Sequence, residues 1–279
     1  MAPQQRSDRI LLETRILSAL IAPVLILAFV ILYIMPDSNG DRFAWFVKPR
    51  MSAMMLGAVY LTGVFFFGSA VFARRWSQVR IGFLPVTAFA ALMGIATILH
   101  WDKFNHQHAA FWLWTVLYAS TPFIVPLVWW RNQLAVAGES LPDGEWIPRV
   151  AQVVIGLLAA GGLAASFLFF VLPEVMIKIW PWTLTQLTSR VLGTEFLLFG
   201  VFGVMMLRDG RWDTMKLPLS LQLASPIFFL GATIISRRDF DWSNPLAWVF
   251  VFNIVFLFVL GIPGLYVYME FWRRRNSLS

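Results

Sequence analysis

The residues of this chain that could hold a metal ion lie in one nine-residue window. It contains all three histidines and one aspartate: His100, Asp102, His106 and His108. Neutral imidazole and carboxylate groups are suitable zinc ligands, so the window could form a metal or acid/base site. The spacing matches no metal motif that we can name, and His106 and His108 share a face only in extended backbone. A structural or pH-sensitive loop is the alternative interpretation.

A different chemistry is indicated by Glu195, which lies inside an apolar stretch. A carboxylate at membrane depth is costly unless it is paired, neutral or facing a wet cavity, so it is a functional candidate. Protonated, it could relay a proton; ionised, it would need a nearby cation. Arg190, His100 and Arg50 complete our set of ligand or proton-relay candidates. The alternative is an interfacial Glu195, one or two turns below the outer boundary, bonded to Arg190 or to an aromatic neighbour.

The composition explains why these few polar residues stand out. Of 279 residues, 59% are hydrophobic and 13% are charged, and the mean hydropathy is +0.70. Soluble domains are about half apolar and a quarter charged, so the sequence predicts a polytopic membrane protein. The absence of cysteine excludes disulfides, thiolate metal sites and cysteine nucleophiles.

The elements expected to position these residues are eight membrane helices. Each apolar stretch is long enough to cross about 30 Å of hydrocarbon, and none alternates like a barrel strand. The expected spans are about 16–35, 51–73, 81–99, 109–130, 150–172, 188–207, 217–235 and 246–269. Prolines interrupt several of them, at Pro122, Pro126, Pro226 and Pro263, and such broken helices can line cavities.

Lysine and arginine counts predict the orientation. With the N-terminus inside, the inner segments hold 14 of the 22 Lys and Arg residues, as expected for cytoplasmic loops. We therefore expect a multi-pass protein of the plasma (inner) membrane with both termini in the cytoplasm. The first apolar run lacks a small-residue cleavage site and is expected to remain as an anchor.

The sequence also indicates an internal repeat. A shift of 136 residues places Arg75-Trp76 on Arg211-Trp212 and Ala96-Thr97-Ile98 on Ala232-Thr233-Ile234. We expect two tandem four-helix halves, residues 1–140 and 141–279, related by a parallel pseudo-two-fold axis along the membrane normal. The alternative is that these residues match by chance, because a few apolar residue types make up much of the sequence. Under this shift Glu195 falls on Val59, and a difference between the halves is where a functional feature is expected.

Several activities find no support in the sequence. It has no phosphate loop, no His-Glu-x-x-His and no Gly-x-Ser-x-Gly motif, and no lysine in a late span for a retinal Schiff base. The Arg clusters beside the spans favour anionic lipid headgroups over nucleic acid. The sequence leaves the cofactor and the small-molecule substrate unknown; the expected partners are the lipid bilayer and, in a membrane complex, other subunits.

Two hypotheses of function remain. The first is a non-enzymatic membrane protein, either a transporter-like protein for a small solute or lipid, with a site near Glu195, or an integral subunit of a membrane complex. The alternative is a membrane enzyme with a metal or acid/base site on the extracytoplasmic side, built from the His100 to His108 cluster. The first needs fewer ionisable groups than metal-assisted hydrolysis does.

Overall fold

The computed structural model describes residues 8–137, 145–223 and 225–276. This part of the chain is helical and contains no β-strand, although one isolated antiparallel bridge joins Trp146 and Arg211. Eight helical segments are long and apolar enough to cross a membrane, and each coincides with an expected span. The predicted all-helical architecture with about eight spans is therefore confirmed, and it is typical of a multi-pass membrane protein.

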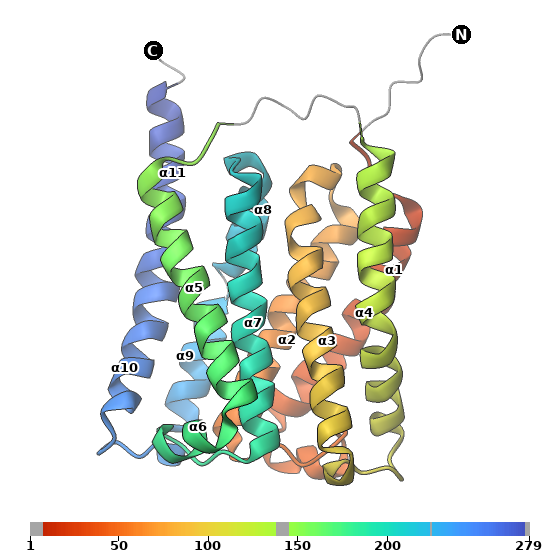
Figure 1. Ribbon diagram of the computed structural model, residues 1–279, viewed down its shortest axis with the longest axis vertical. Helices are drawn as coiled ribbons and strands as arrows, with labels where there is room; N and C mark the ends of the chain where they lie inside the picture. Colours follow the sequence, from red (N-terminus) through yellow and green to blue (C-terminus); the bar gives the residue numbers. More distant parts are fainter. Residues whose placement is uncertain (1–7, 138–144, 224, 277–279) are drawn as a thin grey trace.

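The long segments run alternately up and down, and both ends of the described chain lie at the same end of the molecule (Figure 1). A short helix, α6 (Pro173–Ile179), lies at the opposite end. In chain order the long helices are α1 (Leu12–Phe29), α2 (Arg50–Phe72), α3 (Phe83–Leu99), α4 (Ala109–Ala135), α5 (Arg149–Val171), α7 (Gln186–Asp209), α8 (Trp212–Gln222) with α9 (Ser225–Ile235), and α10 (Pro245–Ile254) with α11 (Ile262–Asn276).

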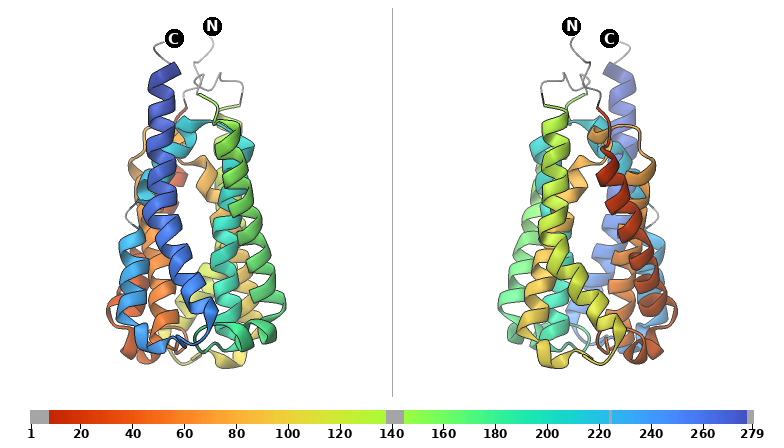
Figure 2. Two further views of the ribbon diagram at one scale, coloured as in Figure 1. Left: turned by 90° about the vertical axis from the view of Figure 1, so that its left-hand side faces the viewer. Right: turned by 90° about the vertical axis from the view of Figure 1, so that its right-hand side faces the viewer.

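The helices form an inner and an outer group (Figure 2). In the inner group α3 packs against α7, and α2 packs against α8 and α9. In the outer group α1 lies on α2, α4 on α3, α5 on α7, and α10 and α11 beside α8 and α9. Between 39% and 56% of the apolar window is buried in the inner spans, against 12% to 33% in the outer ones. The exposed sides of the outer helices are apolar, as contact with lipid requires.

Glycines let α5 and α7 approach closely. A Cβ added to Gly200 would lie 2.9 Å from the backbone nitrogen of Leu163, and one added to Gly203 would lie 2.8 Å from the Cβ of Ala159. Small residues at such positions allow two helix backbones to come into contact. In contrast, a Cβ added to Gly161 would meet nothing within 4 Å. Only part of the small-residue content of α5 therefore serves packing.

Two of the last spans depart from regular α-helix near their prolines. The seventh span divides into α8, which ends at Gln222, and α9, which begins with Ser225-Pro226. The eighth contains a π-helical segment, Val255–Gly261, directly before Pro263. Proline removes a backbone donor and clashes with the carbonyl four residues earlier, and Gln222, four residues before Pro226, is the last residue of α8. Helix α4 continues through Pro122 and Pro126.

Equivalent aromatic clusters recur 136 or 137 residues apart. The first consists of Phe43, Trp45, Phe104 and Trp114, and the second consists of Trp180, Trp182, Phe240 and Phe250. The ring centroids of Trp45 and Trp114 are 4.9 Å apart at 77°, and those of Trp182 and Phe250 are 4.9 Å apart at 75°. The Trp45–Phe104 and Trp182–Phe240 separations are both 5.1 Å.

Backbone and polar contacts recur in the same way at the end that carries the termini. The amide of Trp76 donates to the carbonyl of Asp8, and that of Trp212 donates to the carbonyl of Glu145. The indole of Trp76 donates to Gln133 at 2.7 Å, and the indole of Trp212 donates to Glu270 at 2.9 Å. Each member of the second set lies 136 or 137 residues after its counterpart.

Candidate functional site

Glu195 is buried in the inner group of helices, with 6% of its surface exposed. It lies on α7, nine residues after the helix begins at Gln186, which is about 13 Å along the axis. The carboxylate atom Oε1 is buried without a hydrogen-bond partner among the described residues. A buried polar atom without a partner is costly, so this oxygen requires a proton, a water molecule or a ligand.

Arg190 does not pair with Glu195. Its guanidinium donates to Nε2 of His100 at 2.5 Å and to the carbonyl of Phe170 at 3.2 Å. Five residues along a helix rotate a side chain by about 140°, so Arg190 and Glu195 point to different faces of α7. The helical spacing could have excluded the expected Arg190–Glu195 contact from the sequence alone.

His100 ends α3 and is almost fully buried. Burial and the positive charge of Arg190 lower the pKa of His100. Because a guanidinium only donates, Nε2 of His100 must accept, and the neutral ring then carries its proton on Nδ1. The structure thus brings together two of the candidates, His100 and Arg190, and joins α3 to α7 near the end opposite the termini.

The sequence analysis did not identify a buried tyrosine pair, one member of which interacts with Glu195. Tyr60 on α2 and Tyr118 on α4 are both buried, and their hydroxyl oxygens are 2.9 Å apart. The carboxylate of Glu195 interacts electrostatically with Tyr60. All five tyrosines of the chain lie inside predicted spans, so nothing in the sequence distinguished Tyr60 and Tyr118 from the other three.

A small cavity of about 50 Å³ adjoins the tyrosine pair. Its mostly apolar wall includes Tyr60 and Tyr118, together with Leu198, which lies one turn after Glu195 on α7. A water molecule needs about 10–15 Å³ of such volume, so the cavity can hold water beside the hydroxyl pair.

A second polar group lies between α2 and α9, where the seventh span is broken. The hydroxyls of Thr62 and Ser225 are 3.1 Å apart, and Ser225 donates to Gln222 at 3.2 Å. The hydroxyl of Tyr33 donates to the carbonyl of Phe228 at 2.8 Å in the same region. Both inner interfaces therefore carry buried polar groups within apolar surroundings.

Arg50 lies apart from these groups. It begins α2 and forms an ion pair with Asp37, and both side chains are partly exposed. The nearby amide of Met51 donates to Asp239 at 2.8 Å. Arg50 therefore helps to fix the first turn of α2 and does not contact His100, Arg190 or Glu195 in any interaction described.

The four metal-ligand candidates do not converge. His100 faces Arg190, and the ring of His106 packs on Trp101 and contacts its carbonyl at 2.9 Å. Nδ1 of His108 accepts from the amide of Ala110 and so caps α4. Asp102 is exposed and bonded to Lys103, which lowers the pKa of its carboxyl.

Among the described residues, no three His, Asp or Glu side chains form a group that could hold a metal ion. This metal site remains a prediction without geometric support. The loop instead shows the features of the structural alternative, because its histidines serve as a ring contact, a helix cap and a partner for Arg190.

Comparison with known proteins gave no relative. A scan against protein-family models, a search of curated proteins and a search of solved structures each found no match for this chain.

Proposed function

We propose that this protein is a transporter of the inner membrane, for a small solute or lipid, in which Glu195 takes up and releases a proton during the transport cycle. The observation that carries the proposal is the buried carboxylate of Glu195, one oxygen of which has no partner among the described residues. An ionised carboxylate in this position would be strongly disfavoured, so its charge state is expected to depend on what occupies the site.

The surroundings of Glu195 support a protonation role. The electrostatically coupled Tyr60 and its partner Tyr118 offer a hydroxyl pair that can pass a proton or orient a water molecule. Glu195 is also a buried residue of α7, an inner helix that contacts both α2 and α3. A site between inner helices is where transporters built from repeats hold their substrates.

We also propose that the chain consists of two tandem four-helix halves, 1–140 and 141–279. The recurring aromatic clusters and tryptophan hydrogen bonds support this organisation, because chance identities would not preserve ring separations. The helix pairs agree with it. In the two halves α2 corresponds to α7, and α3 corresponds to α8 with α9, so the contact between α3 and α7 corresponds to the contact between α9 and α2. Under this relation Glu195 corresponds to Val59, and the pair of His100 and Arg190 to Ser236 and Met54.

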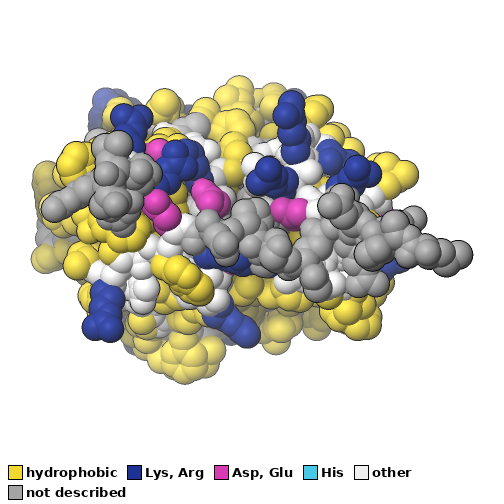
Figure 3. Space-filling view, turned by 90° about the horizontal axis from the view of Figure 1, so that it is seen from above, with side chains coloured by type: hydrophobic (Ala, Val, Ile, Leu, Met, Phe, Trp, Pro, Cys, Tyr) yellow, Lys and Arg dark blue, Asp and Glu magenta, His cyan; other side chains and the backbone are white. Residues whose placement is uncertain are grey.

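We propose that both termini face the cytoplasm. The end that carries them displays many Lys and Arg side chains (Figure 3). The inner segments defined from the sequence hold 14 of the 22 Lys and Arg residues, and the described parts of these segments lie at this end. This asymmetry fits the retention of positive charge on the cytoplasmic side.

The test measures the movement of solutes across the membrane of proteoliposomes that contain the purified protein and are held on a solid support. Jumps in the concentration of amino acids, hexoses, carboxylic acids and organic cations are applied at several pH values, and a fluorescent phospholipid is tested separately for transfer between leaflets. We expect one class of solute, or the lipid, to move in the wild type. We expect Glu195→Gln to abolish the pH dependence of that movement.

Glu174→Gln is the matched control, because Glu174 is an exposed carboxylate at the end of the molecule opposite the termini. It should behave as the wild type does. Identical pH profiles in the wild type and Glu195→Gln would remove Glu195 from the mechanism. If no compound of the panel moves while the folded protein is present in the vesicles, transport of these classes is refuted.

A further inference from the structure

A cavity of about 460 Å³ lies at the end of the molecule that carries the termini, far from Glu195 along α7. Its walls come from three segments that are distant in the sequence: residues 75–78, Arg211 with helix α8, and helix α11. This volume is within the range of small-molecule sites and is much larger than the cavity beside the tyrosine pair.

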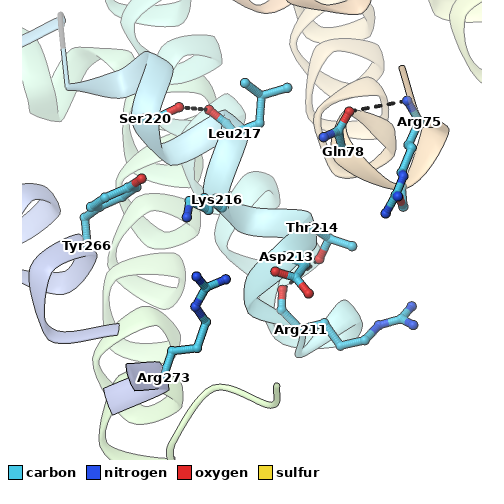
Figure 4. A pocket seen from close by; sticks show the side chains of 11 residues that line it. Arg75, Gln78, Arg211, Asp213, Thr214, Lys216, Leu217, Ser220, Tyr266 and Arg273 are labelled. Carbon is cyan, nitrogen blue, oxygen red and sulfur yellow. Dashed lines mark hydrogen bonds between the residues drawn. The ribbon is translucent and has the colours of Figure 1, made fainter. Parts of the chain in front are cut away.

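The lining is rich in positive charge. Four cationic side chains contribute to it, namely Arg75, Arg211, Lys216 and Arg273, against one carboxylate, Asp213. Figure 4 shows Arg75 and Arg273 approaching from different sides, with Asp213 and Thr214 between them in that view. The four cations come from all three wall segments, so the fold, and not one basic run in the sequence, gathers them.

Carboxylates behind the wall hold three of these cations in place. Asp209 accepts from Arg211 at 3.3 Å, Glu270 accepts from Lys216 at 2.7 Å, and Arg273 lies 3.8 Å from Glu270. Each of these contacts uses only part of the donor capacity of its cation, since a guanidinium has five N–H donors and an ammonium three. The remaining donors can bind a ligand in the cavity with little further loss of side-chain conformational entropy, because these side chains are already held in place.

Arg75 differs from the other three. No ion pair of its guanidinium is found in the part of the chain that the structure describes, and its side chain is exposed. Of the three hydroxyls in the lining, that of Tyr266 can donate to a ligand, whereas those of Thr214 and Ser220 already donate to Asp209 and to the carbonyl of Leu217. Arginine forks and hydroxyls are the groups that proteins use to hold the oxygens of a phosphate.

We propose that this cavity binds a phosphate group. Two sources share this chemistry: the phosphodiester of an anionic phospholipid and a free phosphate compound. The position at the end of the spans, beside the outer helix α11 with its exposed Val267 and Phe271, suits a headgroup, and basic pockets between membrane helices on the cytoplasmic side bind such headgroups. The site is independent of the proposed transport function and uses none of the residues around Glu195.

The experiment measures the thermal unfolding midpoint of the purified protein in a neutral detergent. Separate samples receive inorganic phosphate, dispersed phosphatidylglycerol or dispersed phosphatidylcholine, with sodium chloride added to equal ionic strength. We expect phosphatidylglycerol or phosphate to raise the midpoint in a saturable manner, and phosphatidylcholine and chloride to have no such effect. If only inorganic phosphate raises the midpoint, the ligand is a free phosphate compound. If only phosphatidylglycerol raises it, the ligand is the headgroup of an anionic phospholipid.

Two variants locate the effect. Arg75→Gln and Arg273→Gln should each weaken the apparent affinity by about tenfold or more, the change expected when a hydrogen bond to a charged group is lost. Arg74→Gln is the matched control. Arg74 carries the same charge as its neighbour Arg75 and is also exposed, but it does not line the cavity. Glu195→Gln should bind as the wild type does.

Two results would overturn the proposal. One is equal stabilisation of the wild type, Arg74→Gln and Arg75→Gln by the anionic additives, which would indicate attraction to the whole basic surface. The other is the absence of a saturable shift with either phosphate-bearing additive in folded wild-type protein.

Discussion

At the residue scale the pair of His100 and Arg190 gives the protein a defined response to pH. The pKa of His100 is lowered in the folded protein by burial and by Arg190, so the unfolded chain binds more protons as the pH falls. The stabilisation from the neutral ring is complete above the unfolded pKa of about 6.5 and is lost as the pH falls toward the folded value.

We therefore expect the unfolding midpoint of the wild type to fall between pH 7 and pH 5 more steeply than that of His100→Gln. The glutamine carbonyl can still accept from Arg190 but does not titrate in this range. Thermal unfolding in buffers of constant ionic strength measures the difference. His106→Gln, on the exposed loop nearby, should keep the wild-type slope; a wild-type slope in His100→Gln would contradict the assignment.

The residue scale is also where sequence analysis was weakest. Residue type and hydropathy indicated that Glu195 was unusual, and its burial without a partner for Oε1 agrees with this. The same approach grouped His100 with His106 and His108 because they are close in sequence, whereas their side chains have separate partners. Tyr60 and Tyr118 were missed, because their contact joins α2 to α4 and depends on how the helices are rotated.

At the scale of elements the close packing of α5 and α7 makes a sharp prediction. Gly200→Ala would place a Cβ 2.9 Å from the backbone nitrogen of Leu163 and force the two helices apart. We expect a loss of about 1–3 kcal/mol of stability, the usual cost of overpacking a tight contact.

The matched control for this pair is Gly161→Ala, on α5 itself, where the new methyl group meets nothing within 4 Å. It should leave stability unchanged or raise it by up to about 1 kcal/mol, because alanine favours helix more than glycine does. Unfolding of the purified variants in detergent compares them. Equal effects of the two substitutions would mean that backbone propensity, and not helix contact, controls this position.

The elements themselves were largely predictable from the sequence. Length and hydropathy located all eight spans, because the hydrocarbon core imposes a minimum apolar length on any helix that crosses it. Pro226 correctly marked a break, whereas Pro122 and Pro126 did not, since α4 continues through them. Which face of a helix meets which neighbour could not be read from hydropathy, because lipid and protein interior are almost equally apolar.

At the scale of the whole molecule the proposed orientation can be checked directly, because the chain contains no cysteine. Gln107 and Ser243 are exposed residues on corresponding loops of the two proposed halves, and Arg74 is exposed at the end that carries the termini. In intact cells a membrane-impermeant maleimide should label Gln107→Cys and Ser243→Cys. It should label Arg74→Cys only after the membrane is permeabilised.

Labelling of Arg74→Cys from outside would place the termini on the outer side. Labelling of only one of the two corresponding loops would contradict the common direction of the halves. Both results are independent of transport and of the basic cavity, so the topology can be judged separately from either proposal.

The pairing of α3 with α7 and of α2 with α9 has a consequence for how the molecule could be assembled. Each inner interface joins a helix that precedes Ala137 to a helix that follows Glu145. Contacts between helices therefore hold these two parts of the chain together, in addition to the peptide link. Two polypeptides made separately in one cell, divided between these residues, should recombine into a working particle, as a pair of matching subunits would. Under the proposed division into two halves, a single-chain gene of this kind is what fusion of a self-associating four-helix ancestor would leave behind.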